Sequence, residues 1–224
     1  MGKYILKRIA LAIVTIWAVA TITFFLMNLV PGGPFLSEKA ISPAATKALE
    51  AKYGLDKPMA ERYFTYISDA AHGDFGDSLK QRGRTVMDII ATKFPVSARL
   101  GGMAVVLALC VGVPLGVLAA YKRGTFIDSL FSVIATCGIA VPGFVICTLL
   151  LYVFGVKLQW LPTLGLKSAQ SYIMPVVALA AYPTSYIMRL MRSSMLDVLG
   201  QDYMRTAKAK GLSQKVSLFK HALR

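Results

Sequence analysis

Charged residues are scarce in this sequence, and four long stretches contain none. They make up 16% of the 224 residues, against about 25% in a typical soluble domain. The stretches are residues 9–30, 100–120, 129–156 and 168–188. Each is long enough to cross a bilayer, for which a helix needs about 20 apolar residues. An ordinary soluble domain is therefore excluded, and the sequence predicts an all-α, polytopic transmembrane helical bundle with four spans.

Cysteine and histidine are too few and too scattered to build a site. Cys110, Cys137 and Cys147 all lie inside charge-free stretches, and the two histidines are His72 and His221. We therefore expect no disulfide framework and no metal site. These cysteines are interpreted as small buried apolar residues.

Signatures of catalysis and nucleotide binding are also missing. The sequence has no phosphate-binding loop of the Gly-x-x-x-x-Gly-Lys-[Ser/Thr] type. Asp74-Phe75-Gly76 matches the metal-binding triplet of protein kinases, but the rest of the kinase signature is absent. We therefore expect a chain that is not an enzyme, holds no cofactor and does not bind ATP itself.

The formal net charge is +14, and the basic residues are confined to segments between and beside the charge-free stretches. Residues 1–8 contain three Lys or Arg and no acid, and residues 188–224 contain eight against Asp197 and Asp202. This distribution follows the positive-inside rule, so we expect no nucleic-acid partner. It predicts a cytoplasmic N-terminus, an outer loop over residues 31–99 and a cytoplasmic tail from about residue 189.

The predicted outer loop contains short helical patterns. Pro31-Gly32-Gly33-Pro34 ends the first span. We expect helices over residues 43–52, 58–71 and 85–93, with a turn at residues 73–77. The corresponding domain organisation is a first span over 1–30, an extracytoplasmic helical loop over 31–99 and a core over 100–224.

Prolines inside the spans indicate where helices bend or line a path, because each removes a backbone donor. Candidates for the translocation path are Pro142, Tyr182, Pro183, Thr184 and Ser185. Simple helix packing is the alternative for each of them. Glycines at 112 and 116 form a small-xxx-small pair that favours close helix packing.

The tail carries the most specific pattern. Met195, Leu199 and Tyr203 recur every four residues, which predicts a helix that leaves the membrane and follows its inner surface. The string from Asp202 to Leu212 then ends in Ala-Lys-Gly-Leu, and His221-Ala-Leu-Arg follows. Binding of the basic helix to anionic lipid is the alternative interpretation.

This tail resembles the cytoplasmic signature loop of binding-protein-dependent ABC permeases, in which two small residues, three variable ones and a glycine dock on the ATPase. Thr206, Ala207 and Gly211 occupy the matching positions, and Arg205, where the general pattern has Glu, is typical of the dipeptide/oligopeptide branch. Further landmarks follow in the order of that branch. They are Pro31-Gly-Gly-Pro, Tyr53-Gly-Leu-Asp-Lys-Pro, Gly73-Asp-Phe-Gly-Asp-Ser, Gly112-Val-Pro-Leu-Gly and Trp160-Leu-Pro.

The resemblance implies a MetI-like permease subunit of a type I importer, in a prokaryotic inner membrane. It also implies ATPase subunits that hydrolyse ATP, a second permease subunit and an extracytoplasmic substrate-binding protein as partners, within the lipid bilayer. The predicted docking residues are Asp202, Arg205, Thr206, Ala207, Gly211, Leu212 and His221. The family has six spans, so we expect this chain to be an incomplete subunit.

Three other functions are compatible with the sequence. Nickel and glutathione importers share the same motifs, so the substrate is open within the family. A non-transporting membrane scaffold with a lipid-binding tail is a second possibility. A secondary transporter is disfavoured, because no charge lies inside any predicted span.

Overall fold

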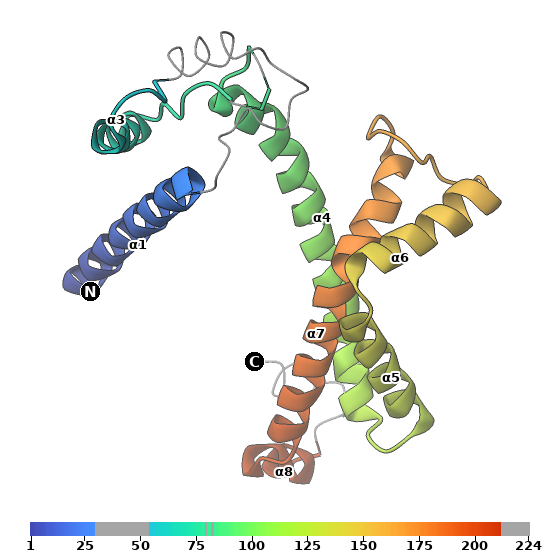
Figure 1. Cartoon of the computed structure of the whole chain (residues 1–224). Helices are drawn as coiled ribbons and strands as arrows, with labels where there is room; N and C mark the ends of the chain where they lie inside the picture. Colours follow the sequence, from blue (N-terminus) through green and yellow to red (C-terminus); the bar gives the residue numbers. More distant parts are fainter. Residues whose placement is uncertain (30–53, 79, 82, 212–224) are drawn as a thin grey trace. The chain divides into compact units, whose positions relative to one another are not determined.

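The computed structural model describes residues 1–29, 54–78, 80, 81 and 83–211 (Figure 1). The chain divides into two compact units, Met1–Phe94 and Pro95–Arg224, which are described separately below. Within the described residues the regular elements are all helices, beside an isolated antiparallel bridge between Asp77 and Thr85. The predicted all-α class is therefore confirmed.

Long apolar helices dominate the described chain. Three are long and apolar enough to cross a membrane: Gly2–Leu29, Val86–Tyr121 and Ala169–Leu199. A fourth span is present if the pair Phe126–Ala140 and Gly143–Lys157 is counted as one, although it bends by 102°. These four regions contain, to within a residue at Leu29 and Ala169, the four stretches predicted from the absence of charge.

In the first unit, α1 (Gly2–Leu29) is joined to α3 (Met59–Ala71) by polar and aromatic contacts. The hydroxyls of Thr21 and Tyr63 lie 2.8 Å apart, and the Arg62 guanidinium donates to Asn28 Oδ1 at 2.7 Å. Phe24 and Phe25 both pack against the ring of Tyr63. These contacts hold α3 against the last turns of α1.

Two sequence predictions for the loop are tested here. The helix predicted at residues 58–71 forms, with Pro58 as its N-cap. The turn predicted at residues 73–77 also forms, and Gly73 and Gly76 adopt positive φ angles of 82° and 71°. The helix predicted for 85–93 is longer than expected, since α4 (Val86–Tyr121) runs on without a break through Pro95 and Pro114. The helix predicted over 43–52 lies outside the described residues.

In the second unit, α4 packs against α7 (Ile173–Leu199) through glycine. A Cβ at Gly112 would lie 2.8 Å from the carbonyl oxygen of Thr184, and one at Gly116 would lie 2.6 Å from that of Met188. The two backbones therefore meet with no room for a methyl group between them. This is the close packing that the Gly112–Gly116 spacing predicts.

The third span is broken at Pro142. Helix α5 (Phe126–Ala140) ends there, and α6 (Gly143–Leu150) continues into the π-helical turn η1 (Leu151–Lys157) in a new direction (Figure 1). Val141 is extended, with φ −80° and ψ 121°, because a proline disfavours the helical conformation of the residue before it. The bend of 102° follows from this local restriction.

The fourth span begins with a short turn, η2 (Ala169–Tyr172), and continues as α7 to Leu199. Pro183 lies inside α7, and Pro175 lies in its first turn, where the missing N–H has no helical partner to lose. Helix α8 (Asp202–Ala209) follows as a separate element (Figure 1). The continuous helix predicted from Met195 through Tyr203 is therefore wrong, since the chain breaks at Gly200 and Gln201.

Candidate functional site: the α8 end of the helix bundle

Helix α8 is held against the end of α7 by one apolar side chain. Met204 is 1% exposed and packs with Met195 of α7 and Ala120 of α4. Tyr203, which the four-residue spacing places on the packed face, is 50% exposed. The break at Gly200 shifts the helical register, so that Met204 replaces Tyr203 in the core. Sequence spacing alone gave no signal for this shift.

Five of the predicted docking residues are described: Asp202, Arg205, Thr206 and Ala207 belong to α8, and Gly211 follows it. Asp202 opens the helix, and the Thr206 hydroxyl donates to the Asp202 carbonyl at 3.0 Å. Gly211 adopts φ +75°, a left-handed conformation that L side chains rarely adopt. The helix therefore ends and turns at this glycine, as the Ala-Lys-Gly-Leu string predicts. The backbones of Arg205 and Ala207 lie within α8, whereas Leu212 and His221 lie outside the described residues.

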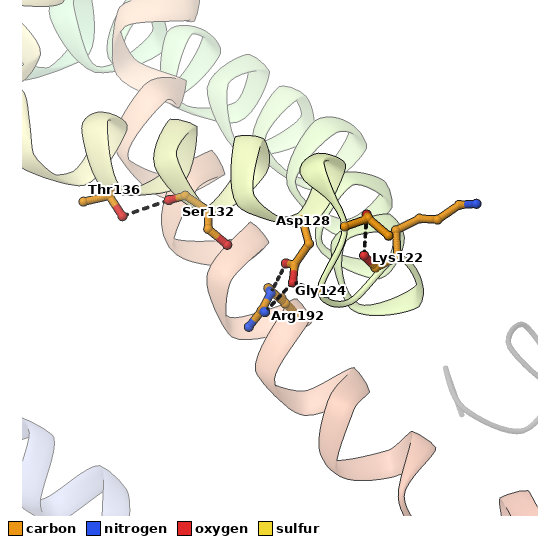
Figure 2. A network of polar contacts seen from close by, with 7 residues as sticks. Lys122, Gly124, Asp128, Ser132, Thr136 and Arg192 are labelled. Atoms are coloured by element: carbon orange, nitrogen blue, oxygen red, sulfur yellow. Dashed lines mark hydrogen bonds and ion pairs between the residues drawn. The ribbon is translucent and has the colours of Figure 1, made fainter.

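An ion pair joins α5 to α7 near the same end of the bundle (Figure 2). The Arg192 guanidinium donates to both carboxylate oxygens of Asp128, from Nε at 2.5 Å and from a terminal nitrogen at 2.8 Å. The backbone N–H of Gly124 donates to the same carboxylate at 3.1 Å. This is the bidentate fork that arginine and a carboxylate form most favourably.

Within the Asp128–Arg192 pair, the carboxylate is largely buried and the guanidinium is partly exposed. The Asp128 side chain is 8% exposed and that of Arg192 is 31% exposed. Because Gly124 lies in the turn between α4 and α5, the pair fixes that turn to α7.

Sequence reasoning missed this pair, since it treated both residues as loop charges. The available signal was their placement, an acid in the first turn of α5 and a base about two turns before the end of α7. Opposite charges at adjacent ends of two antiparallel spans indicate a bridge. Only the packing of α5 on α7 brings them together.

The five path candidates do not form one cluster. Pro142 lies at the bend between α5 and α6. Ser185 is 5% exposed and faces Gly138 of α5, where an added Cβ would clash with its hydroxyl. The carbonyl of Thr184 lies against Gly112, and Pro183 lies within α7. Tyr182, in contrast, is 55% exposed.

No group of three or more His, Cys, Asp or Glu residues in the described ranges has the geometry of a metal site. The arrangement at the α8 end of the second unit can act mechanically and electrostatically. It consists of helix α8, which is anchored by Met204, the turn at Gly211, and the Asp128–Arg192 ion pair, which joins α7 to α5.

Comparison with known proteins covers the whole chain. Residues 112–224 match the family described as "Binding-protein-dependent transport system inner membrane component". Residues 1–101 match its N-terminal counterpart, "Binding-prot-dependent transport system membrane comp, N-term".

Individual relatives show the same likeness. The chain is 44% identical over 226 residues to the oligopeptide transport system permease protein OppB of Salmonella typhimurium, covering all of this chain and 74% of that protein. It is 42% identical to OppB of Escherichia coli K12, with the same coverage. It is also 43% identical over 224 residues to the dipeptide transport system permease protein DppB of Bacillus subtilis, covering 73% of that protein.

Proposed function

Because the chain belongs to the family of binding-protein-dependent transport system inner membrane components, we propose that it is the permease subunit of an ATP-driven peptide importer. Its helices form part of the translocation path, and a loop around α8 couples that path to a separate ATPase. Peptide is favoured over nickel or glutathione because the similar relatives are named as oligopeptide and dipeptide permeases.

One observation carries the coupling role. Helix α8 is short, amphipathic and basic, and its buried residue Met204 packs against Met195 of α7 and Ala120 of α4. The helix ends in the left-handed turn at Gly211. A rigid surface element of this kind transmits force only if it is held at one end and contacts a partner at the other.

The proposed mechanism is a two-state movement. Closure of the ATPase dimer on ATP displaces α8, and α8 displaces the end of α7 through Met204 and Met195. The Asp128–Arg192 pair then carries the movement to α5 and to the turn after α4. Such coupling requires that the two states differ in their contacts with the ATPase.

The proposed orientation follows the positive-inside rule, with the N-terminus and α8 in the cytoplasm of a prokaryotic cell. An extracytoplasmic binding protein delivers peptide to the outer face, and a second permease subunit completes the path. ATP is hydrolysed on the ATPase subunits, and the docking face consists of Asp202, Arg205, Thr206, Ala207, Gly211, Leu212 and His221. Pro142, Tyr182, Pro183, Thr184 and Ser185 remain the path candidates.

Replacement of Gly211 by leucine tests this function in the assembled transporter. A Cβ at Gly211 meets no atom within 4 Å, so the variant acts through the strained φ angle rather than through a clash. We expect ATP-dependent peptide uptake into proteoliposomes to fall at least tenfold while membrane insertion and ATP hydrolysis persist.

Gly102→Leu is the matched control, because Gly102 also has open space around its Cβ position but lies within α4 without a positive φ. It should retain uptake. Normal peptide uptake by Gly211→Leu would count against the docking role of this turn.

A further inference from the structure

Helix α7 presents three distinct sides within the second unit. One side meets α4 at Thr184 and Met188, through Gly112 and Gly116. A second meets α5 at Ser185, through Gly138. The third side is exposed, and residues at helical spacing share it: Leu179, Tyr182, Tyr186, Arg189, Leu190 and Ser193.

The two tyrosines on the exposed side are poorly suited to lipid. Tyr182 and Tyr186 are 55% and 53% exposed. Tyr182 lies about 14 Å along the helix from Ile173, at 1.5 Å per residue, which places it near the middle of a hydrocarbon core about 30 Å thick. In the described chain neither hydroxyl has a hydrogen-bond partner. Because an unsatisfied hydroxyl in hydrocarbon is costly, this side of α7 faces water, peptide or protein.

Arg189 lies on the same side of α7. Its guanidinium donates to the Thr136 hydroxyl of α5 at 3.0 Å, and that hydroxyl in turn donates to the Ser132 carbonyl at 2.8 Å (Figure 2). Among the residues that the structure describes, no carboxylate pairs with Arg189, whereas Arg192 is paired with Asp128. Arg189 directly follows the charge-free stretch 168–188, so it lies at the end of the span beside the Asp128–Arg192 pair. A guanidinium that no carboxylate pairs with is available there to bind an anion.

A cavity of about 310 Å³ opens beside Arg189, between α4, α5 and α7. Its lining supplies three hydroxyls and the Arg189 guanidinium, beside the guanidinium of Arg192, which is already paired with Asp128. The lining residues are Ala119, Phe131, Ser132, Ala135, Thr136, Met188, Arg189, Arg192 and Ser193. Hydroxyl donors and a positively charged guanidinium around a small cavity favour the binding of an oxyanion. The cavity has room for a carboxylate group and a small side chain.

We propose that Arg189 binds the C-terminal carboxylate of the transported peptide in this cavity, and that Tyr182 and Tyr186 line the route to it. The inference rests on the proposed function. Peptides of different sequence share only their backbone and their two charged ends. A carrier that accepts many sequences therefore gains a common contact by holding the terminal carboxylate.

The test uses the assembled transporter without its binding protein, so that the preferences of that protein do not enter. The probe is a tripeptide that carries benzoylphenylalanine and is photo-crosslinked to the permease. Unlabelled trialanine and trialanine amide compete with the probe, and the two differ only in the charge of the C-terminal group. We expect trialanine to compete about tenfold better than its amide in the wild type.

The Arg189→Gln variant should lose this preference, so that the two competitors become equal. Arg99→Gln is the matched control, because among the described residues Arg99 donates to the Tyr172 hydroxyl, which lies just before the opposite end of α7. It should keep the wild-type preference. If Arg189→Gln does not fold, Arg189→Lys should reduce the preference and Thr136→Val should weaken it, since Thr136 positions the guanidinium.

Two results would overturn the proposal. One is equal competition by trialanine and its amide in the wild type, or an absence of photolabelling. The other is a preference that survives in Arg189→Gln, or in both Arg189→Lys and Thr136→Val. Failure of the proposed function is recognised separately, as an absence of ATP-dependent peptide uptake by the complete wild-type transporter.

Discussion

The contact between α4 and α7 allows a prediction in which one methyl group decides stability. In Gly116→Ala the new Cβ would lie 2.6 Å from the carbonyl oxygen of Met188 and 2.7 Å from the Cβ of Met191. Contacts under 3.0 Å are essentially never seen for real Cβ atoms. The first of these neighbours is backbone, so a rotamer change cannot relieve the clash. The helices must separate by several tenths of an ångström.

The expected cost follows from two opposing effects. Forcing an extra methyl group into a packed core costs about 1–3 kcal/mol. Replacing glycine by alanine inside a helix gains up to about 1 kcal/mol from helix propensity. Gly102→Ala, with nothing within 4 Å of its Cβ position, receives the propensity gain alone. The difference between the two variants isolates the packing cost, and Gly116→Ala should be less stable by about 1–3 kcal/mol.

Thermal or detergent-induced unfolding of the purified protein, monitored by circular dichroism, measures this difference. A lower unfolding midpoint for Gly116→Ala than for Gly102→Ala is expected. Equal midpoints for the two variants would refute the close approach of α4 and α7 at Gly116.

The remaining predictions concern the α8 end of the bundle. Asp128→Asn should destabilise the protein by about 3 kcal/mol, because it leaves the Arg192 charge unpaired. The double variant Asp128→Arg with Arg192→Asp should recover part of this loss in the same unfolding assay. No recovery would argue against a direct pair. Met204→Ala should cost about 2–5 kcal/mol of local packing and make α8 more sensitive to limited proteolysis. Tyr203→Ala changes a half-exposed neighbour, so its free energy of unfolding should stay within about 0.5 kcal/mol of the wild type. Similar proteolysis of Met204→Ala and Tyr203→Ala would contradict the anchoring role of Met204.

Much of the fold could be predicted because the bilayer restricts the choices. A span must be a largely charge-free helix of about 20 residues. Lys122 and Lys157 therefore marked the ends of α4 and η1 closely, whereas α7 continues past Arg189 to Leu199. Prolines indicated where helices could bend, since a proline acts on its own backbone and on the residue before it. The sequence did not say which of them breaks its helix: Pro142 does, whereas Pro114 and Pro183 lie inside continuous helices. The Gly112–Gly116 spacing predicted close packing for a similarly local reason.

Other features could not be predicted, because they depend on which helices meet. The partner of Asp128 is 64 residues away, and only the antiparallel packing of α5 and α7 selects Arg192 rather than Arg189. Met204 became the anchor of α8 because the chain breaks at Gly200 and changes register. The burial of Ser185 against Gly138 likewise required the three-dimensional contact. Residue types alone placed Ser185 and Tyr182 together, whereas the structure puts them on different sides of α7.

The most direct test of the account concerns the side of the membrane on which α8 lies. In a variant without native cysteines, a single cysteine replaces Lys210, at the end of α8, and a second variant carries one in place of Asp56, in the predicted outer loop. A membrane-impermeant maleimide is applied to intact cells and then to permeabilised cells. The account predicts that the cysteine at 56 is labelled in intact cells and that the cysteine at 210 is labelled only after permeabilisation. Labelling of the cysteine at 210 in intact cells would contradict the proposed coupling of α8 to a cytoplasmic ATPase.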